Sequence, residues 1–349
     1  MTVIKNLLGK KILVTGGAGY IGSHTVLALL RAGYQVSVID NFCNSSPESL
    51  RRVSKIVGRS ISCVHGDVRD VELLSKLFSE NEFSAVFHFA GLKSVGDSIR
   101  NPLAYYDNNV GGTVQLCKAM ADADVFKLVF SSSATVYGEP AEIPIRETCP
   151  LSVATNPYGR SKLMAEDTLR DLAKSDSRWK IALLRYFNPA GADRSGQIGE
   201  DPTGVPNNLL PYISQIAVGK LKMLRIFGND YQTLDGTGVR DYIHVQDLAS
   251  GHLKALAAIE LTSGIKIWNL GTGQGYSVLQ IVSVFEKISG KSIPFEFVPR
   301  RQGDIAECWA DPTQAFLDLN WKAELGLTEM LSDAWRWQSK NPDGYEVKS

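Results

Sequence analysis

The sequence predicts an α/β fold in which a doubly wound parallel sheet precedes a smaller mixed α/β region. Three observations indicate this architecture. A strand-like run at residues 12–15 leads through a glycine-rich turn into an apolar helix-like segment. From there to about residue 185, short apolar runs alternate with helix-like segments, which is typical of parallel strands joined by crossover helices. After Asn188 this alternation loosens and a second region begins.

The glycine-rich turn at residues 11–22 carries Gly16, Gly19 and Gly22 at intervals of three residues. Gly16 permits the tight turn, Gly19 lets the backbone approach a pyrophosphate, and Gly22 lets helix and strand pack closely. Unpaired N–H groups at the start of the helix then hold phosphates. An ordinary glycine-rich turn would share the spacing, but the flanking strand and helix and the acid described next favour a Rossmann dinucleotide site.

A second strand-like run ends at Asp40, about 20 residues beyond the turn, where a group that binds the ribose diol is expected. A carboxylate accepts hydrogen bonds from ribose hydroxyls and repels a 2′-phosphate. Residues 41–44, which follow, contain no Lys or Arg. Asp40 therefore predicts NAD rather than NADP as the cofactor.

Further strands are expected at residues 36–39, 61–64, 85–89, 128–130 and 181–184, in a sheet covered by helices on both faces. We expect a cofactor domain over residues 1–187, to which 239–262 return, and a substrate domain over 188–349. Within the latter, residues 193–206 form a loop. Helices are expected at 207–219, 279–289 and 327–337, and short strands at 223–227, 265–269 and 295–298.

Ligands on such a sheet lie at the carboxyl ends of the strands. At one of these ends, Asp67 can accept a hydrogen bond from an adenine amino group, cap the next helix, or do both. At another, Phe89, Ala90 and Gly91 let the backbone contact the cofactor. Lys93 follows them, and its position favours contact with an anionic ligand over a plain surface charge.

Residues 101–121 are expected to form one long helix with Asn108 and Asn109 in its middle, where asparagine is a poor helix former. We expect one of the two to face inward and bond a neighbouring backbone group. This helix and residues 157–174 are long enough to bundle with a second copy, so we expect a homodimer. Amphipathic stripes more often pack against the chain's own core.

Three serines, Ser131, Ser132 and Ser133, end the fifth run, and alone they would only satisfy local backbone groups. The next helix begins with Tyr158 and Lys162, which a spacing of four residues places on one face. A phenol has a reference pKa of about 10, and lowering it by about 3 units needs about 4 kcal/mol. A nearby ammonium and a positively charged nicotinamide can supply this. Ser133 would hold a substrate hydroxyl and relay its proton.

The composition excludes several classes of partner. Lys plus Arg and Asp plus Glu balance at 37 each among 349 residues, so we expect neither nucleic acid nor an anionic membrane as a partner. Hydrophobic residues make up 44% of the chain, yet no run approaches a membrane span, and Leu7 and Leu8 are too brief for a signal-peptide core. The five cysteines are Cys43, Cys63, Cys117, Cys149 and Cys308. Their odd number and wide spacing predict reduced thiols in a cytoplasmic protein without a metal site.

Ten stretches along nearly the whole chain resemble the extended short-chain dehydrogenase/reductase family and, within it, the UDP-glucose 4-epimerases. Five mark the superfamily: residues 15–22 (TGGAGYIG), 89–95 (FAGLKSV), 105–110 (YYDNNV), 131–138 (SSSATVYG) and 158–164 (YGRSKLM). Five are more informative about activity: residues 184–190 (LRYFNPA), 206–211 (PNNLLP), 226–231 (IFGNDY), 235–245 (DGTGVRDYIHV) and 300–304 (RRQGD).

This resemblance implies NAD-dependent interconversion of UDP-glucose and UDP-galactose. Tyr158 would take the proton of the sugar 4-hydroxyl, Lys162 would bind the nicotinamide ribose, and Ser133 would bridge the hydroxyl. The 4-keto sugar would then turn over and regain its hydride on the other face, while NAD stays bound. The implied cofactor contacts are Gly16, Gly19, Tyr20, Ile21, Gly22, Asp40, Asn41, Asn44, Ser45, Asp67, Val68, Phe89, Ala90, Gly91, Lys93, Asn108, Ser131, Tyr158, Lys162 and Tyr186.

For a UDP-hexose, the resemblance implies that Arg240 and Arg301 bind the pyrophosphate and that Asp304 accepts from the uridine ribose. Phe227 would pack on the uracil, although a plain core role is almost as common. The implied substrate contacts are Lys93, Ser133, Tyr158, Phe187, Asn188, Asn207, Asn208, Leu209, Phe227, Arg240, Tyr242, Arg301, Asp304 and Cys308.

Two positions refine the implied activity. Dehydratases of this superfamily carry Asp-Glu after the catalytic hydroxyl residue, whereas Ala134 and Thr135 stand here, so elimination of water lacks a general acid. Cys308 lies where the family varies a pocket residue between a bulky Tyr and a small side chain. Its small size leaves room for an N-acetyl group, so we expect activity on UDP-N-acetylhexosamines as well. The alternative is a core cysteine with no part in specificity.

Two other functions stay open at this point. An enzyme acting on a different sugar, such as a UDP-uronate, would need extra cationic or hydroxyl groups near C5. A catalytically silent NAD-binding sensor is also compatible with the fold. Such a sensor would not need Ser133, Tyr158 and Lys162 together.

Overall fold

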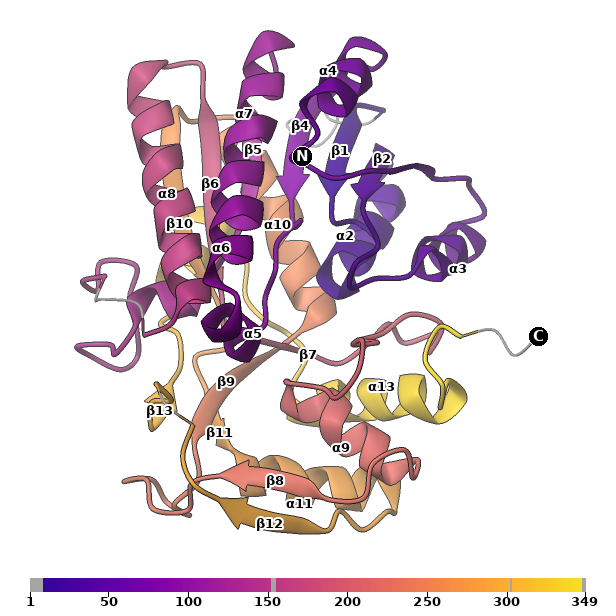
Figure 1. Cartoon of the computed structure of the whole chain (residues 1–349), viewed down its shortest axis with the longest axis vertical. Coiled ribbons are helices and arrows are strands. Elements are labelled where there is room, and N and C mark those ends of the chain that lie inside the picture. The colour runs from indigo at the N-terminus through magenta and orange to yellow at the C-terminus, as the bar shows by residue number, and fades with distance from the viewer. Residues whose placement is uncertain (1–8, 152–154, 302, 347–349) are drawn as a thin grey trace.

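The computed structural model describes residues 9–151, 155–301 and 303–346. In Figure 1 an upper region built on a large sheet lies above a lower region with smaller sheets. Leu7 and Leu8, on which the argument against a signal peptide rests, lie outside the described residues. Among the described helices, none is long and apolar enough to cross a membrane.

The upper region contains a seven-stranded sheet in the order β10-β6-β5-β4-β1-β2-β3, with every neighbouring pair parallel. Its strands are β1 Lys11–Thr15, β2 Gln35–Asp40, β3 Ser62–His65, β4 Phe83–His88, β5 Lys127–Ser133, β6 Lys180–Tyr186 and β10 Gly264–Leu270. The reversal of strand order next to β1 makes the sheet doubly wound, so the predicted fold class is confirmed.

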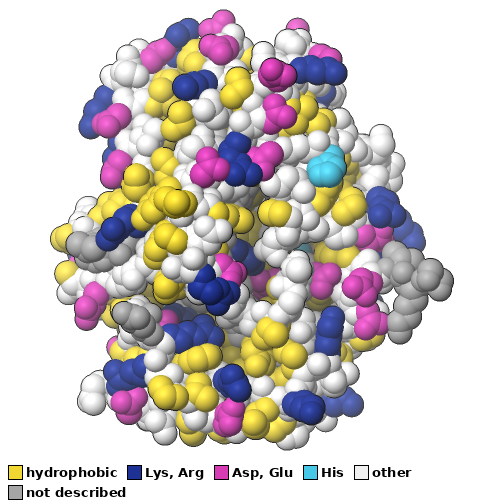
Figure 2. All heavy atoms as spheres, in the orientation of Figure 1, with side chains coloured by type: hydrophobic (Ala, Val, Ile, Leu, Met, Phe, Trp, Pro, Cys, Tyr) yellow, Lys and Arg dark blue, Asp and Glu magenta, His cyan; other side chains and the backbone are white. Residues whose placement is uncertain are grey.

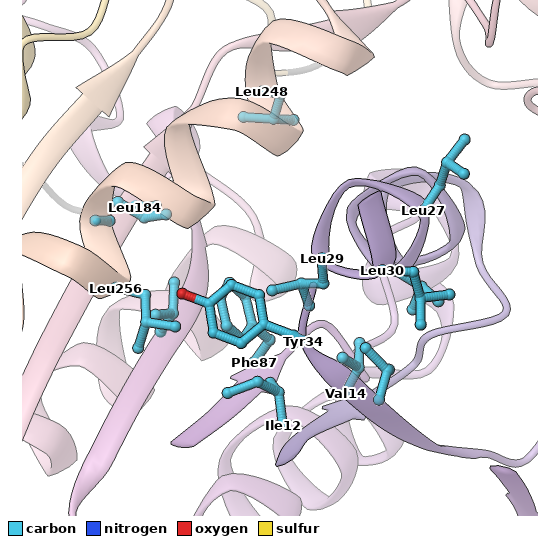
Figure 3. Close-up of a cluster of buried hydrophobic side chains, with 14 of the residues drawn as sticks. Ile12, Val14, Leu27, Leu29, Leu30, Tyr34, Phe87, Leu184, Leu248 and Leu256 are labelled. Atoms are coloured by element: carbon cyan, nitrogen blue, oxygen red, sulfur yellow. The ribbon is translucent and has the colours of Figure 1, made fainter. Parts of the chain in front are cut away.

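Helices cover both faces of this sheet because successive side chains of each strand point to opposite sides. On one face Ile12 and Val14 pack with α2 (Tyr20–Arg31) and α10 (Val245–Ile259), around Tyr34 and Leu256 in Figure 3. On the other face Leu13 packs with α4 (Val71–Ser79), α7 (Gly112–Asp122) and α8 (Pro157–Ser175). Each such leucine or isoleucine contributes about 1.5–3 kcal/mol by burial. The α3 helix (Pro47–Val57) continues the first layer beside α2.

Strand β10 departs from the expectation, which assigned residues 265–269 to the substrate domain. It pairs with β6 over its full length, from Gly264 opposite Lys180 to Leu270 opposite Tyr186. Its apolar residues explain this pairing, because Ile267 packs against one buried cluster of the sheet and Leu270 belongs to the other. The segment that returns to the upper region is therefore α10 and β10. The division into a cofactor domain and a substrate domain stays a prediction.

The lower region contains two small sheets. One joins β11 (Gly275–Ser277), β9 (Val239–His244) and β13 (Glu307–Cys308), with β7 (Asn188–Ala190) also paired to β9. The other joins β8 (Leu224–Phe227) and β12 (Phe295–Val298). Helices α9 (Leu209–Ala217), α11 (Val278–Ser289) and α13 (Leu327–Lys340) pack against them around a separate core. Residues 239–244 of the segment expected to return to the upper region thus form β9, which pairs with strands of the lower region.

The expected single helix over residues 101–121 is interrupted. The chain forms α6 (Pro102–Tyr105), a π-helix η1 (Tyr106–Gly111) and then α7, while α5 (Val95–Arg100), η2 (Ala134–Tyr137) and α12 (Thr313–Leu319) are short helices that were not expected. In η1 the side chain of Asn109 accepts from Leu92 N at 2.8 Å and donates to Leu92 O at 3.0 Å. The inward asparagine expected from the sequence is thus Asn109, and it fixes the loop after β4.

Candidate functional site

The glycine-rich turn brings the start of α2 against the loop after β4. A Cβ added at Gly16 would lie 2.6 Å from Ala90 N, and one added at Gly22 would lie 2.2 Å from Gly16 O. Helix α2 begins after Gly19 without a side-chain cap or an acid in its first turn. No acidic side chain of this described helix therefore lies in its first turn, and the first backbone N–H groups can bind an anion.

Asp40 ties the end of β2 to this turn. Its carboxylate accepts from Ala18 N at 2.9 Å, from Phe42 N at 2.9 Å and from Ser45 Oγ at 2.8 Å. The side chain is buried, so these bonds fix its orientation at the strand end. The remaining acceptor positions of the carboxylate can serve a ribose diol.

Asp67 does not cap the next helix, because Asp70 is the residue whose side chain accepts from Leu73 N at the start of α4. Asp67 instead accepts from Asn41 Nδ2 at 2.9 Å and from the Arg69 guanidinium at 2.7 Å. The Arg69 guanidinium holds the pKa of Asp67 well below its usual range. Arg69, which the sequence analysis missed, thus fixes the carboxylate expected to meet adenine.

The other expected cofactor residues lie near the carboxyl ends of the strands. These are Tyr20 and Ile21 in the first turn of α2, Asn41, Asn44 and Ser45 after β2, Val68 before α4, Phe89, Ala90, Gly91 and Lys93 after β4, Asn108 in η1, Ser131 in β5 and Tyr186 at the end of β6. Their positions agree with one binding edge, while their contacts with NAD stay predictions.

Strand β5 and helix α8 bring the three expected catalytic side chains together. Tyr158 lies in the first turn of α8, whose cap Asn156 accepts from Gly159 N at 2.9 Å. The hydroxyl of Tyr158 hydrogen-bonds the side chain of Ser133. Lys162, one turn later, donates from Nζ to Ser131 O at 2.8 Å. Ser133 and Tyr158 are therefore paired as the predicted proton relay requires.

Burial dominates the electrostatics of this trio. It raises the pKa of Tyr158 above its usual value of 10.0, although the bond with Ser133 opposes the shift. It also lowers the pKa of Lys162 to about 8, although the Glu166 carboxylate opposes that shift. The chain's own groups alone therefore do not favour a phenolate, and the expected joint effect of the Lys162 ammonium and an oxidised nicotinamide stays a prediction. At neutral pH Lys162 is still mostly a cation, and Tyr158 holds its proton.

Glu200 joins the two regions and was missed by sequence reasoning. Its Oε1 lies 3.1 Å from Lys93 Nζ of the upper region and accepts from Asn208 Nδ2 of the lower region at 2.7 Å. Asn207 bridges the same gap by donating to Ser94 Oγ at 3.3 Å. An acid within a loop gives no periodic signal, so only the folded geometry reveals this contact.

The lower region supplies the residues expected to bind UDP. Arg240 on β9 lies in register with Cys308 on β13 and donates from Nη1 to Val239 O at 2.8 Å. The Arg301 guanidinium lies 3.8 Å from the centre of the Phe227 ring. Tyr242 on β9 pairs with Asn188 on β7, and Phe187 directly precedes β7. Leu209 is the first residue of α9. Asp304 donates its backbone N–H to Arg301 O at 3.2 Å. Gln302 of the RRQGD stretch lies outside the described residues.

Asp241, a second missed residue, fixes the strand that carries Cys308. This fully buried carboxylate accepts from Thr272 N at 2.9 Å, Gly273 N at 3.0 Å and Ala310 N at 3.1 Å. Three backbone donors on one carboxylate hold β9, the loop after β10 and the end of β13 together.

The comparisons with known proteins agree on one family. A family model described as GDP-mannose 4,6 dehydratase matches residues 13–334. UDP-glucose 4-epimerase from Bacillus subtilis (strain 168) is 59% identical over 335 residues, which are 96% of this chain and 98% of that protein. UDP-glucose 4-epimerase from Homo sapiens is 56% identical over 348 residues, which are 98% of this chain and 100% of that protein. The chain belongs to the UDP-glucose 4-epimerase family. The resemblance drawn from the sequence is therefore confirmed.

Solved structures of this family share the fold. UDP-glucose 4-epimerase from Bifidobacterium longum in complex with NAD+ and UDP has a TM-score of 0.94 and 52% identity, covering 96% of this chain and 100% of that chain. The protein from Stenotrophomonas maltophila with bound NAD and formylated UDP-arabinopyranose has a TM-score of 0.93 and 49% identity, covering 95% and 99%. Within the described residues, no group of three or more His, Cys, Asp or Glu side chains is arranged to hold a metal ion.

Proposed function

We propose that this chain interconverts UDP-glucose and UDP-galactose by oxidation and reduction at C4, with NAD bound at the glycine-rich turn. The observation that carries the proposal is the meeting of Ser133, Tyr158 and Lys162 beside that turn. UDP-glucose 4-epimerases at 56–59% identity over nearly the full chain support the same activity. The presence of Ala134 and Thr135 in place of an Asp-Glu pair argues against the dehydratase activity named by the family description.

The chain's own residues fit an NAD molecule. The cradle between Gly16 and Ala90 is too close for a Cβ, and the first turn of α2 offers free N–H groups to a pyrophosphate. Asp40 would accept from the adenosine ribose, and Lys162 would donate to the nicotinamide ribose. NAD, when bound, supplies an acceptor for the C4 hydride and later returns it.

Tyr158 would take the proton of the sugar 4-hydroxyl through or beside Ser133. Because burial raises the pKa of Tyr158, the protein relies on positive charge next to the phenol to favour the phenolate. The ammonium of Lys162 contributes part of this charge and the oxidised cofactor the rest. When the hydride returns to the other face of C4, Tyr158 returns the proton.

The lower region would hold UDP while leaving the sugar able to turn. Arg240 and Arg301 would bind the pyrophosphate with charge-assisted hydrogen bonds. Phe227, whose ring already packs with Arg301, would contact the uracil. Lys93 and Asn208 bind Glu200 in this structure, and both would reach ligand oxygens from the same position.

Activity on UDP-N-acetylglucosamine and UDP-N-acetylgalactosamine is a second part of the proposal. Cys308 packs against the cluster that contains Phe187 and Ala134, the residue that follows Ser133 in the sequence. A Tyr at this position would fill the space that a small side chain leaves beside sugar C2. Cys308→Tyr should lower turnover of the N-acetyl substrates more than about tenfold and keep that of UDP-glucose within about threefold. Cys308→Ala is the matched control, and equal losses on both substrate classes would contradict this part.

We also propose a homodimer formed through α5, α6 and α8. Ile99, Leu103 and Met164 are 54%, 77% and 43% exposed, and Figure 2 shows hydrophobic side chains gathered on this face. Burying such a patch favours association. Sedimentation of the wild type and of Leu103→Asp tests the proposed dimer, since the variant should shift toward monomer.

The free cysteines, of which Cys43 is exposed, favour a reducing compartment such as the cytoplasm.

The test of the activity is an assay of the purified protein with each UDP-sugar and no added NAD. We expect UDP-galactose to form from UDP-glucose, and a trace of reduced nicotinamide absorbance to appear with substrate. Turnover of a UDP-uronate but not of UDP-glucose would favour the alternative enzyme. Absence of any substrate-dependent reduction would favour a silent NAD-binding sensor and contradict the proposal.

A further inference from the structure

Helix α8 carries a buried carboxylate one turn beyond Lys162. Glu166 is 0% exposed and accepts from Ser132 Oγ at 2.5 Å, from Arg185 Nε at 3.0 Å and Nη2 at 2.7 Å, and from Arg170 Nη2 at 2.6 Å. Arg185 lies on β6 and is 1% exposed. The pair therefore joins α8 to two neighbouring strands of the sheet.

Arg185 extends the connection to the segment that follows Ser133. Its Nη1 donates to Tyr137 Oη at 2.9 Å, and Tyr137 donates to Asn269 Oδ1 at 2.7 Å. Tyr137 ends η2, the short helix that begins directly after Ser133. One ion pair thus contacts both elements that carry the catalytic side chains.

The three serines at the end of β5 each hold one position of α8. Ser131 O accepts from Lys162, Ser132 Oγ donates to Glu166, and Ser133 hydrogen-bonds Tyr158. Consecutive residues of the strand therefore fix positions along two turns of the helix. On the strand Ser132 lies between Ser131 and Ser133, and on the helix its partner Glu166 lies one turn beyond Lys162.

Stability alone does not explain a buried ion pair here. The desolvation of two buried charges roughly cancels their attraction, and apolar residues of similar volume are often as stabilising. What apolar residues cannot provide is directional bonding that fixes distance and angle. Catalytic groups need placement within about 0.5 Å, and a misplacement of about 1 Å can cost about 100-fold in rate.

We propose that Ser132, Glu166 and Arg185 form a positioning hub that sets the register of α8 against β5, and so the distance from Ser133 to Tyr158. This inference rests on the proposed function and assigns these residues no contact with substrate. The Glu166 carboxylate also favours the ammonium form of Lys162, so the hub acts on charge as well as on position.

The first test is Ser132→Ala, which removes one hydrogen bond and keeps the ion pair of Glu166 with Arg185. We expect kcat for UDP-glucose to fall about 10- to 100-fold, with KM within about twofold and bound NAD unchanged. Ser37→Ala is the control, since Ser37 is a buried serine of the same sheet whose hydroxyl has no hydrogen-bond partner among the described residues. Its kcat should match the wild type.

The second test is Glu166→Gln, which keeps the shape and removes the charge. The alkaline limb of the kcat–pH profile should move to lower pH, because the ammonium of Lys162 loses a stabilising neighbour. A merely structural role would lower the melting temperature without moving this limb. If this variant does not fold, Ser132→Ala decides alone.

Full kcat in Ser132→Ala, measured well below its melting temperature, would overturn the hub. An unmoved alkaline limb in a folded Glu166→Gln enzyme would overturn the electrostatic part. Failure of the proposed function is recognised separately, because the wild type and Ser37→Ala would then both lack turnover of UDP-glucose.

Discussion

The upper and lower regions contribute unlike walls to the candidate site. In the upper wall, Lys162 is buried and Ser133 and Tyr158 are half-buried, and all three belong to a long strand and a 19-residue helix. In the lower wall, Arg301 and Asp304 are exposed loop residues beside small sheets. If the walls act as proposed, the comparison teaches that rigid elements place the reacting groups, whereas loops are sufficient to recognise a nucleotide.

Tyr158→Phe should give the largest effect that is specific to the upper wall. Loss of the phenol removes the proton acceptor without a change of shape, so kcat should fall about 10³-fold or more, while bound NAD and KM change little. Turnover of UDP-glucose and the nicotinamide content of the purified variant measure this. Tyr212→Phe, on α9 of the lower region, is the control. Near-normal turnover of Tyr158→Phe would break the comparison.

Arg301→Ala should show the opposite pattern. Loss of a charge-assisted bond to a pyrophosphate costs about 1.5–3 kcal/mol, so KM for UDP-glucose should rise about 10- to 100-fold with kcat within about threefold. Arg300→Ala is the matched control, because Arg300 is engaged with Asp230 at 2.7 Å and packs on Tyr231. A fall in kcat as large as that of Tyr158→Phe would remove the distinction between the walls.

The smallest predicted effect is a loss of unfolding free energy at mildly acidic pH, caused by buried histidines of the upper region. Burial lowers the pKa of His24 and His252 to about 4 and that of His88 to about 3, below the unfolded value of about 6.5. The unfolded chain therefore binds more protons between pH 6.5 and about 4, and stability falls as pH falls through this window.

From pH 7 to pH 6 each of these histidines should cost about 0.7 kcal/mol, a factor of about three in the unfolding equilibrium. Urea unfolding at the two pH values measures the loss, and His252→Gln should remove about a third of it. His65→Gln, at an exposed histidine, should leave the difference unchanged. A pH-independent unfolding free energy would show that the burial of these rings does not control stability.

Local sequence patterns were sufficient to predict the elements that form the upper wall. The glycine turn, the acid at Asp40 and the spacing of Tyr158 and Lys162 are contiguous signals, since each depends on one turn or one helix face. The parallel, doubly wound class of the sheet followed from strand–helix alternation, and the family from motifs spread over the chain, whereas the order of the strands came only from the structure. Whether these residues bind NAD and UDP as expected stays a prediction.

Contacts between distant segments were not predictable in this way. The pairing of β10 with β6 and the bridge by Glu200 each join residues more than 80 positions apart. Asp70 rather than Asp67 caps α4, because the intervening turn is fixed by Arg69. The π-helix at Asn109 depends on a bond to Leu92 in another loop. Such outcomes depend on tertiary geometry, which overrides local propensity.

The late position of strand β10 in the sequence has a consequence for folding during synthesis. Translation releases residues in order, and N-terminal units begin to fold first. Until residues 264–270 leave the ribosome, β6 remains an uncovered edge with open backbone groups, a template for mispairing with other nascent chains. Strand β10 covers this edge only after β9 of the lower region has been synthesised. A chain whose translation stalls before β10 would therefore expose the edge of β6 to other chains.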